Sequence, residues 1–175
     1  MAESASGSGT PPPGKRSDAR RNEETLLAAA GVGVGTIYRH FPTRADLIVA
    51  VYRHQVEACA DAGPTLLSDG NSPHAALTDW INLFVDFLIT KRGLAGALQS
   101  DSSAFETLHA YFLDRLVPVC AQLLEAAAAA GEIVHDVEAY ELMRGVGNIC
   151  IGADTDPDYD ARRMVQLVIA GLRRQ

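Results

Sequence analysis

The sequence has few of the residues that build disulfide frameworks or metal centres. Its 175 residues include three cysteines, Cys59, Cys120 and Cys150, which are widely spaced and form no C-x-x-C pair. The five histidines show neither H-x-x-x-H nor H-E-x-x-H spacing, which are spacings that place two ligands on one metal. The acidic run at residues 154–160 lacks the glycine and the glutamate of an EF-hand loop. We therefore expect reduced, buried thiols and no bound metal.

Catalytic and membrane signals are absent as well. The sequence contains no G-x-S-x-G elbow, no Walker loop and no dinucleotide fingerprint, so we expect neither enzymatic activity nor a cofactor. It also shows no signal peptide and no apolar run long enough to cross a bilayer. These absences predict a cytoplasmic protein without a membrane partner.

The composition that remains favours helices and a sizeable core. Hydrophobic residues make up 47% of the chain, charged residues 21%, and alanine-rich runs are frequent, which predicts an all-α fold. The net charge of −7 is unevenly distributed. Residues 1–55 carry seven Lys/Arg and five Asp/Glu, whereas residues 56–175 carry eight and seventeen. A mildly basic end on an acidic body fits DNA contact confined to that end, although an acidic enzyme could show the same asymmetry.

The patterns along the chain predict a short tail, a small head and a helical body. Residues 1–14 have too little apolar content to pack and are expected to be disordered. We assign residues 15–46 to the head and 47–175 to the body. For the body we expect a first helix over 43–62 with a stop at Gly63-Pro64, and a second from Pro73 to residues 91–93. A third is expected over 105–130, with a kink or break near Pro118. The last two are expected from Asp136 to about 152 and from about Asp160. Residues 94–101 are expected to form a short helix or a loop.

The most specific pattern lies at residues 31–47. Glycines at positions 31, 33 and 35 open it, two turns of helix follow from Val34 to His40, and Pro42 ends that helix. Thr43 then caps a second helix, with Asp46 as its partner in a capping-box-like start. Hydroxyl, imidazole and guanidinium groups on a short exposed helix suit phosphate oxygens and base edges.

This stretch, G-V-G-V-G-T-I-Y-R-H-F-P-T-R-A-D-L, closely resembles the turn, recognition helix and following helix start of the tetracycline-repressor (TetR) family. The resemblance implies a homodimeric, ligand-responsive repressor that binds double-stranded operator DNA through a helix-turn-helix. The competing explanation of the motif is a helical hairpin with an aromatic packing cluster. The implied DNA-binding residues are Val34, Gly35, Thr36, Tyr38, Arg39, His40 and Arg44, with Lys15, Arg16, Arg20 and Arg21 on a basic arm.

The chain departs from the family pattern just before the motif. It passes from Leu27-Ala-Ala-Ala30 directly into Gly31, where a family member would complete its first helix and build a second. We interpret this as an internal deletion of roughly twenty to twenty-five residues, the length of half a helix, a turn and a short helix. The alternative function is therefore a helical ligand-binding or dimerisation protein that has lost DNA binding.

The body contains candidates for an effector pocket and a dimer interface. Aromatic and other side chains at helical spacing predict a mostly apolar effector pocket, although such residues are more often plain core. These candidates are Trp80, Phe84, Phe87, Phe105, Tyr111, Phe112, Met143 and Asn148. The resemblance implies that the last two helices pair with their copies in a four-helix homodimer interface, the alternative being that they pack within a monomer.

Overall fold

The structure is a computed structural model that describes residues 39–70, 72–98, 102–134, 136–151, 156 and 158–174, except for the side chains of residues 44, 90–98 and 102–105. The chain divides into two units between Asp46 and Leu47. The predicted tail, the basic arm and the junction at Ala30-Gly31 lie outside the described residues.

Helices make up nearly all of the described chain, which confirms the all-α prediction. They are α3 (Arg44–Ser68), α4 (Pro73–Leu98), α5 (Ser102–Ala129), α6 (Ala139–Ile149) and α7 (Ala161–Gly171). Within the described residues the one extended pairing is an isolated antiparallel bridge between Ile133 and Arg173. Two backbone hydrogen bonds flank it, from Val134 N to Leu172 O and from Arg174 N to Glu132 O.

Three helix starts follow from their sequence signals. The Thr43 hydroxyl accepts a hydrogen bond from Asp46 N at 3.1 Å, and the Asp46 carboxylate accepts one from Thr43 N at 3.0 Å. This reciprocal pair is the predicted capping box. At α4 the Ser72 hydroxyl accepts from a backbone N–H at 3.2 Å, just before Pro73. At α7 the Asp160 carboxylate accepts from the backbone N–H of Arg163 at 3.0 Å, and the helix begins at Ala161, close to its predicted start.

Several predicted helix boundaries are wrong. Gly63-Pro64 does not end the first body helix, because α3 continues to Ser68. Lys91-Arg92-Gly93 does not end α4, which runs on through a leucine- and alanine-rich segment to Leu98. Leucine and alanine are strong helix formers, and each glycine costs only about 1 kcal/mol relative to alanine, so α4 can continue across Gly93 and Gly96.

Two further boundaries need correction. Pro118 does not break α5, which continues through it to Ala129; the kink, the other predicted outcome, stays a prediction. The helix expected from Asp136 begins at Ala139 instead, with Glu138 as its N-cap, and ends at Ile149 rather than near 152. Ile133 is held in the bridge to Arg173, and the backbone of Glu138 is extended, with φ −75° and ψ 135°, so helical conformation begins only at Ala139.

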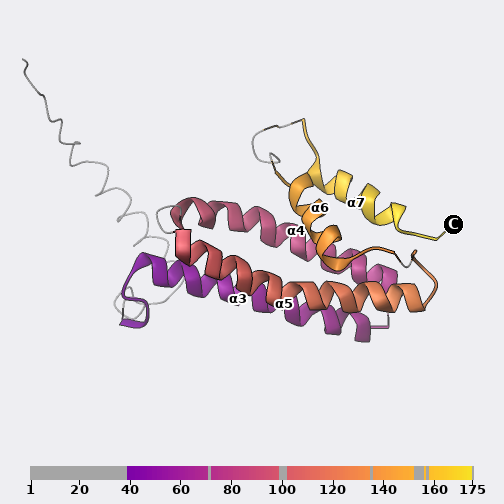
Figure 1. Cartoon of the computed structure of the whole chain (residues 1–175), viewed down its shortest axis with the longest axis horizontal. Helices are drawn as coiled ribbons and strands as arrows, with labels where there is room; N and C mark the ends of the chain where they lie inside the picture. The colour runs from indigo at the N-terminus through magenta and orange to yellow at the C-terminus, as the bar shows by residue number, and fades with distance from the viewer. Residues whose placement is uncertain are drawn as a thin grey trace, which may run out of the picture. The chain divides into compact units, whose positions relative to one another are not determined.

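The body is a layered helical bundle. The part of α3 in the body lies beside α4 and α5, while α6 packs on α5 and α4 and α7 packs on α4 and α6 (Figure 1). The fully buried side chains at its centre are Val56, Leu77, Trp80, Ile81, Phe84, Val85, Leu116, Cys120, Leu123, Val146, Cys150 and Val165. They occur on all five helices, so the core joins the whole body.

His74 has a structural role at the start of α4. Its side chain is buried, and its Nε2 lies 3.4 Å from the carbonyl oxygen of Ile169 on α7. Its backbone N–H donates to the Glu132 carboxylate at 2.6 Å. A carboxylate at a helix N-terminus satisfies an unpaired N–H and opposes the positive end of the helix dipole. The contacts of His74 therefore join α4, the loop after α5 and α7.

Candidate functional site

The described end of the head agrees with the predicted helix stop. Arg39 and His40 are helical and exposed, Phe41 is half-buried and outside the helix, and Pro42 follows. The backbone of Arg44 begins α3. The other proposed DNA contacts, and the Arg44 side chain, lie outside the described residues: Val34, Gly35, Thr36, Tyr38, Lys15, Arg16, Arg20 and Arg21. DNA contact by these residues stays a prediction.

A cavity lies between α4, α5 and α6 in the body. Its volume is about 220 Å³. We call it the aromatic cavity; it is lined by Phe84, Leu88, His109, Phe112, Leu113, Tyr140, Met143, Arg144, Gly147 and Asn148. The lining residues that the structure describes include no carboxylate, and the one formally charged group among them is the Arg144 guanidinium.

The floor of the aromatic cavity is a stack of rings. Phe84 and Phe112 are stacked with centroids 5.9 Å apart, and Phe87 stacks on Phe112 at 5.7 Å. The imidazole of His109 stacks on Phe112 at 5.8 Å. Phe84, Phe112 and Met143 are buried, so the inner lining of the cavity consists of aromatic carbon and a thioether, with the backbone of Gly147 beside them. Such a surface suits a flat apolar group.

Polar side chains of α6 and α5 surround the mouth of the cavity. Tyr140, Arg144, Asn148 and His109 are all exposed. Arg144 Nη1 donates to the Tyr140 hydroxyl at 3.2 Å. The Arg144 guanidinium thus bonds to a neutral phenol, and no described carboxylate forms an ion pair with it.

The predicted pocket residues divide into three groups. Phe84, Phe112, Met143 and Asn148 line the aromatic cavity. Trp80, Phe87 and Tyr111 do not line it, and the side chain of Phe105 lies outside the described part of the chain. Sequence reasoning missed His109, Tyr140 and Arg144 as lining residues. The available signal was the four-residue spacing of Tyr140, Arg144 and Asn148, which places them on one helix face.

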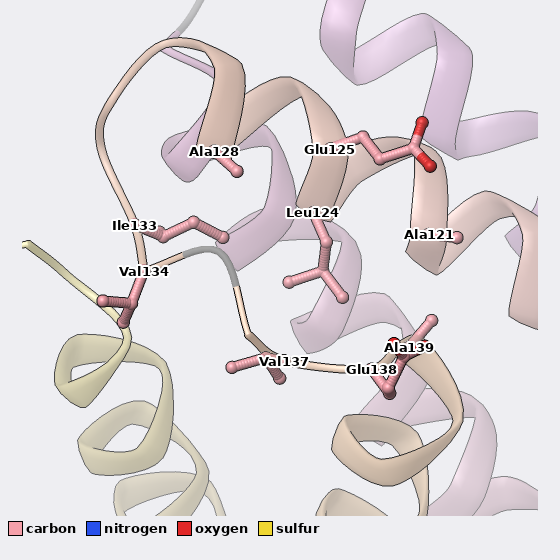
Figure 2. Close-up of a pocket in the computed structure, with 9 residues that line it drawn as sticks. All are labelled: Ala121, Leu124, Glu125, Ala128, Ile133, Val134, Val137, Glu138 and Ala139. Carbon is pink, nitrogen blue, oxygen red and sulfur yellow. The ribbon is translucent and has the colours of Figure 1, made fainter.

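A second cavity of about 230 Å³ lies between α5, the following loop and α6. Figure 2 shows the apolar side chains of Leu124, Ile133 and Val137 around a common space. Glu125 and Glu138 also line it. Among the described residues that line it there is no aromatic side chain and no basic group, in contrast to the aromatic cavity.

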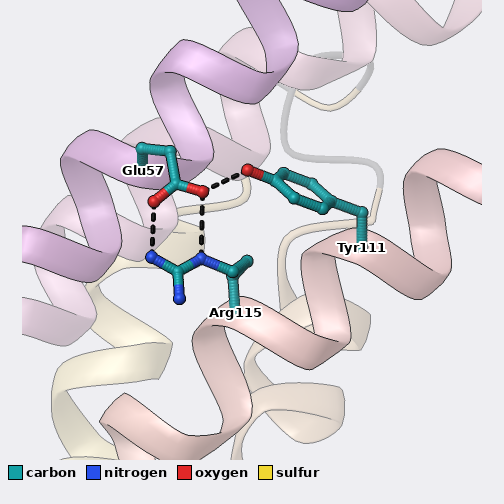
Figure 3. Close-up of polar contacts among 3 residues, drawn as sticks. All are labelled: Glu57, Tyr111 and Arg115. Carbon is teal, nitrogen blue, oxygen red and sulfur yellow. Dashed lines mark hydrogen bonds and ion pairs between the residues drawn. The ribbon is translucent and has the colours of Figure 1, made fainter.

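A polar cluster joins α3 to α5. Arg115 donates to both carboxylate oxygens of Glu57, from Nε at 2.9 Å and from Nη2 at 2.5 Å, and the Tyr111 hydroxyl donates to the same carboxylate (Figure 3). The Arg53 guanidinium lies 4.8 Å from the centroid of the Tyr111 ring. We call Glu57, Tyr111 and Arg115 the Glu57 cluster. Hydrogen bonds from Arg115 and then Tyr111 lower the pKa of Glu57 from 4.5 to about 2.

Acid should weaken the Glu57 cluster in a defined window. Because the folded pKa is depressed, the stabilisation from the Glu57 carboxylate is complete above about pH 4.5 and is lost as the pH falls towards 2. We expect Glu57→Gln to lower the melting temperature at pH 6, and the difference from wild type to shrink steadily below pH 4.5. Thermal denaturation followed by circular dichroism would measure it. Glu125→Gln removes an exposed carboxylate outside the cluster and serves as control. A difference unchanged between pH 6 and pH 3 would contradict the assignment.

The cysteines are buried and free of disulfides, as predicted. Burial raises the pKa of Cys59 and of Cys120 to about 12. A thiol with so high a pKa carries almost no thiolate near neutral pH, so these two side chains act as core residues. Within the described residues no group of three or more metal-ligating side chains comes together. None of the described helices combines the length and hydropathy of a membrane span.

Comparison with known proteins finds two sequence families and several solved structures that resemble this chain. Residues 72–174 match the family described as "Transcriptional regulator SbtR-like, C-terminal domain", and residues 24–51 match "Bacterial regulatory proteins, tetR family". No curated protein matches the chain significantly.

Three solved structures illustrate the similarity. A TetR transcriptional regulator from Streptomyces coelicolor has 34% identity and a TM-score of 0.76, with 87% of each chain covered. A TetR transcription regulatory protein from Mycobacterium vanbaalenii has 27% identity and a TM-score of 0.68, over 91% of this chain and 99% of that one. A tetR-family regulatory protein from Rhodococcus RHA1, at 18% identity and a TM-score of 0.53 over 87% and 86%, shares the fold alone.

Proposed function

This chain belongs to the TetR family of transcriptional regulators, and we propose that it is a homodimeric repressor whose binding to operator DNA responds to a small effector. The observation that carries the proposal is the continuity of α3. This helix begins at Arg44, just after the exposed Arg39 and His40, and runs unbroken to Ser68 in the body. There it is bonded to α5, the helix that supplies His109 and Phe112 to the aromatic cavity.

We propose that DNA is contacted by the segment that ends at Arg44. Arg39 supplies a positive charge for phosphate, and His40 and Tyr38 bind phosphate groups of the DNA. Thr36 and the peptide backbone at the glycines lie nearest the base edges. The basic arm adds affinity that depends on salt but not on sequence. The remaining proposed contacts are Val34, Gly35, Arg44, Lys15, Arg16, Arg20 and Arg21.

The homodimer is supported by apolar side chains that the single chain leaves exposed on its last two helices. Leu167 is 58% exposed, and Met164, Val168 and Tyr140 are also exposed. Gly145 on α6 has open space around the position of a Cβ, so another helix could approach it closely. Large apolar side chains grouped on a surface indicate a binding face, and a two-fold dimer buries the same face on both copies.

An effector would act by binding one arrangement of the body better than another. A ligand shifts a conformational equilibrium only as far as its affinities for the two states differ. We propose that occupation of the aromatic cavity favours a position of α5, and hence of α3, in which the two heads of the dimer no longer match successive major grooves.

DNA binding is tested with duplexes that the 175-residue chain selects from a random pool. We expect sequence-specific binding by a species of two chains, measured by gel shift and sedimentation. Affinity should fall steeply with salt, because Lys and Arg displace counterions from phosphate. Arg39→Ala should weaken binding to all sequences, and it should reduce the slope of log affinity against log salt concentration by about one.

Arg174→Ala is the matched control, since it removes an exposed arginine near the other end of the chain. Failure to enrich any sequence, with the protein folded and dimeric, would overturn the repressor proposal. That result would favour the alternative, a helical ligand-binding or dimerisation protein that has lost DNA binding through the missing head helix.

A further inference from the structure

We propose that the aromatic cavity binds a small planar aromatic carboxylate, with Arg144 as the partner of the carboxylate. The role of the cavity as an effector site rests on the proposed function, but binding of the carboxylate does not require DNA. The proposal follows from the size of the cavity, the rings on its floor and the charge at its mouth.

Size and shape restrict the ligand to a small flat molecule. The volume of about 220 Å³ is below the roughly 300–1,000 Å³ typical of sites for drug-sized ligands. Phe84 and Phe112 are stacked at 5.9 Å, and Met143 lies on the facing helix. Aromatic side chains and a polarisable sulfur favour contact with another aromatic ring over a flexible chain.

The charge of the lining selects an anion. Arg144 carries a positive charge at the mouth, and none of the described lining residues is acidic. Its one hydrogen bond among the described side chains goes to the Tyr140 hydroxyl, at 3.2 Å. A guanidinium that is not already paired with a carboxylate can bind one with two parallel hydrogen bonds. A cationic ligand would meet repulsion here with no compensating partner.

Polar neighbours complete the set of donors. The Tyr140 oxygen accepts from Arg144, which leaves its hydroxyl hydrogen for a ligand oxygen. Asn148 follows Arg144 by one helical turn and also lines the cavity, so its amide provides a further donor. The aromatic ring of the ligand would then lie in the apolar part of the cavity near Met143, and the carboxylate would lie at the solvent edge, where its desolvation is small.

The test is calorimetric titration of the dimeric protein without DNA, using benzoate and 2-naphthoate as probes. We expect at least one of the two carboxylates to bind about tenfold or more tightly than its neutral amide, because a charge-assisted bidentate contact is lost in the amide. Benzylamine, which has the opposite charge, should not bind detectably. Equal affinity for carboxylate and amide, or binding by neither acid, would overturn the proposal.

Three variants connect the binding to this cavity. Arg144→Gln should weaken carboxylate binding about tenfold, Arg144→Lys should retain part of the affinity, and Arg174→Gln should change nothing. Gly147→Leu should abolish binding, since Gly147 lines the cavity and a Cβ there meets open space. Unchanged melting temperatures would show that each variant is folded. Wild-type affinity in Arg144→Gln would refute the assignment of the carboxylate partner.

Addition of the bound probe to the DNA complex separates the two claims. Release of DNA supports both the ligand class and the regulatory role of the cavity. Carboxylate binding that depends on Arg144 but leaves DNA affinity unchanged supports the ligand class and counts against the regulatory role.

Discussion

Trp80→Ala is expected to lower the free energy of unfolding by roughly 3–5 kcal/mol, the range found when a large aromatic core residue is truncated. Trp80 is fully buried, its Nε1 donates to the Cys59 carbonyl oxygen at 2.9 Å, and its ring is stacked on Phe84 at 5.7 Å. The variant loses apolar burial, a ring contact and the hydrogen bond between α4 and α3. The loss should also reach the aromatic cavity, because Phe84 forms part of its floor.

Urea denaturation followed by circular dichroism would measure this loss, since Trp80 is the one tryptophan of the chain and its removal eliminates the fluorescence signal. Trp80→Phe is the matched variant. It keeps a ring in the core and deletes the N–H donor, so its destabilisation should be smaller than that of the alanine variant. A loss below about 1 kcal/mol for Trp80→Ala would be typical of a surface site and would contradict the buried position.

Gly63→Ala is expected to destabilise the protein although alanine is the better helix former. A Cβ at Gly63 would lie 2.2 Å from Cγ1 of Val119 on α5. Valine in a helix has one strongly preferred rotamer, so this methyl group cannot turn aside cheaply. Overpacking typically costs about 1–3 kcal/mol, while the gain in helix propensity is about 1 kcal/mol. A net loss of up to about 2 kcal/mol follows from these two figures.

The double variant Gly63→Ala with Val119→Ala provides the control. Removal of the opposing methyl groups should make the effect of Gly63→Ala neutral or stabilising, so the two changes should be strongly non-additive in a double-mutant cycle. Purely additive effects, or a stabilised Gly63→Ala single variant, would show that α3 and α5 do not approach this closely.

Helix identity and several helix starts could be predicted because their causes are local. The Thr43–Asp46 capping box and the Asp160 cap each depend on groups within three residues of one another. The long helices follow from apolar residues at helical spacing, and their buried faces form the core. Sequence spacing contains the information for such features.

The wrong boundaries have causes that are not local. Gly63 looks like a stop signal in the sequence, yet it lies buried against Val119 and Trp80, where its missing side chain permits close helix contact. Nothing in residues 60–66 reveals that Val119 will be opposite. In the same way, glycine at position 93 is compatible with a helix that continues to Leu98.

The residues of the candidate site could be predicted only in part, because spacing reveals apolar side chains but not contacts between distant residues. Aromatic spacing identified Phe84, Phe112 and Met143, because residues that line an apolar cavity resemble core residues in sequence. Glu57 and Arg115 were missed, since two charged side chains 58 residues apart give no sign that they pair. Tyr111 was predicted to line the effector pocket. It does not line the aromatic cavity, and its hydroxyl donates to Glu57 on α3 instead.

The placement of Tyr111 beside Phe112 has a consequence for how the body can transmit a signal. Successive side chains on a helix diverge by about 100°, so one turn of α5 presents a cavity wall on one side and an anchor for α3 on another. Under the proposed function, a ligand that contacts Phe112 would therefore act on the same helix whose Tyr111 hydroxyl donates to Glu57 on α3. A movement of α5 would then pass directly from the cavity to α3 across one helix, without a loop between them.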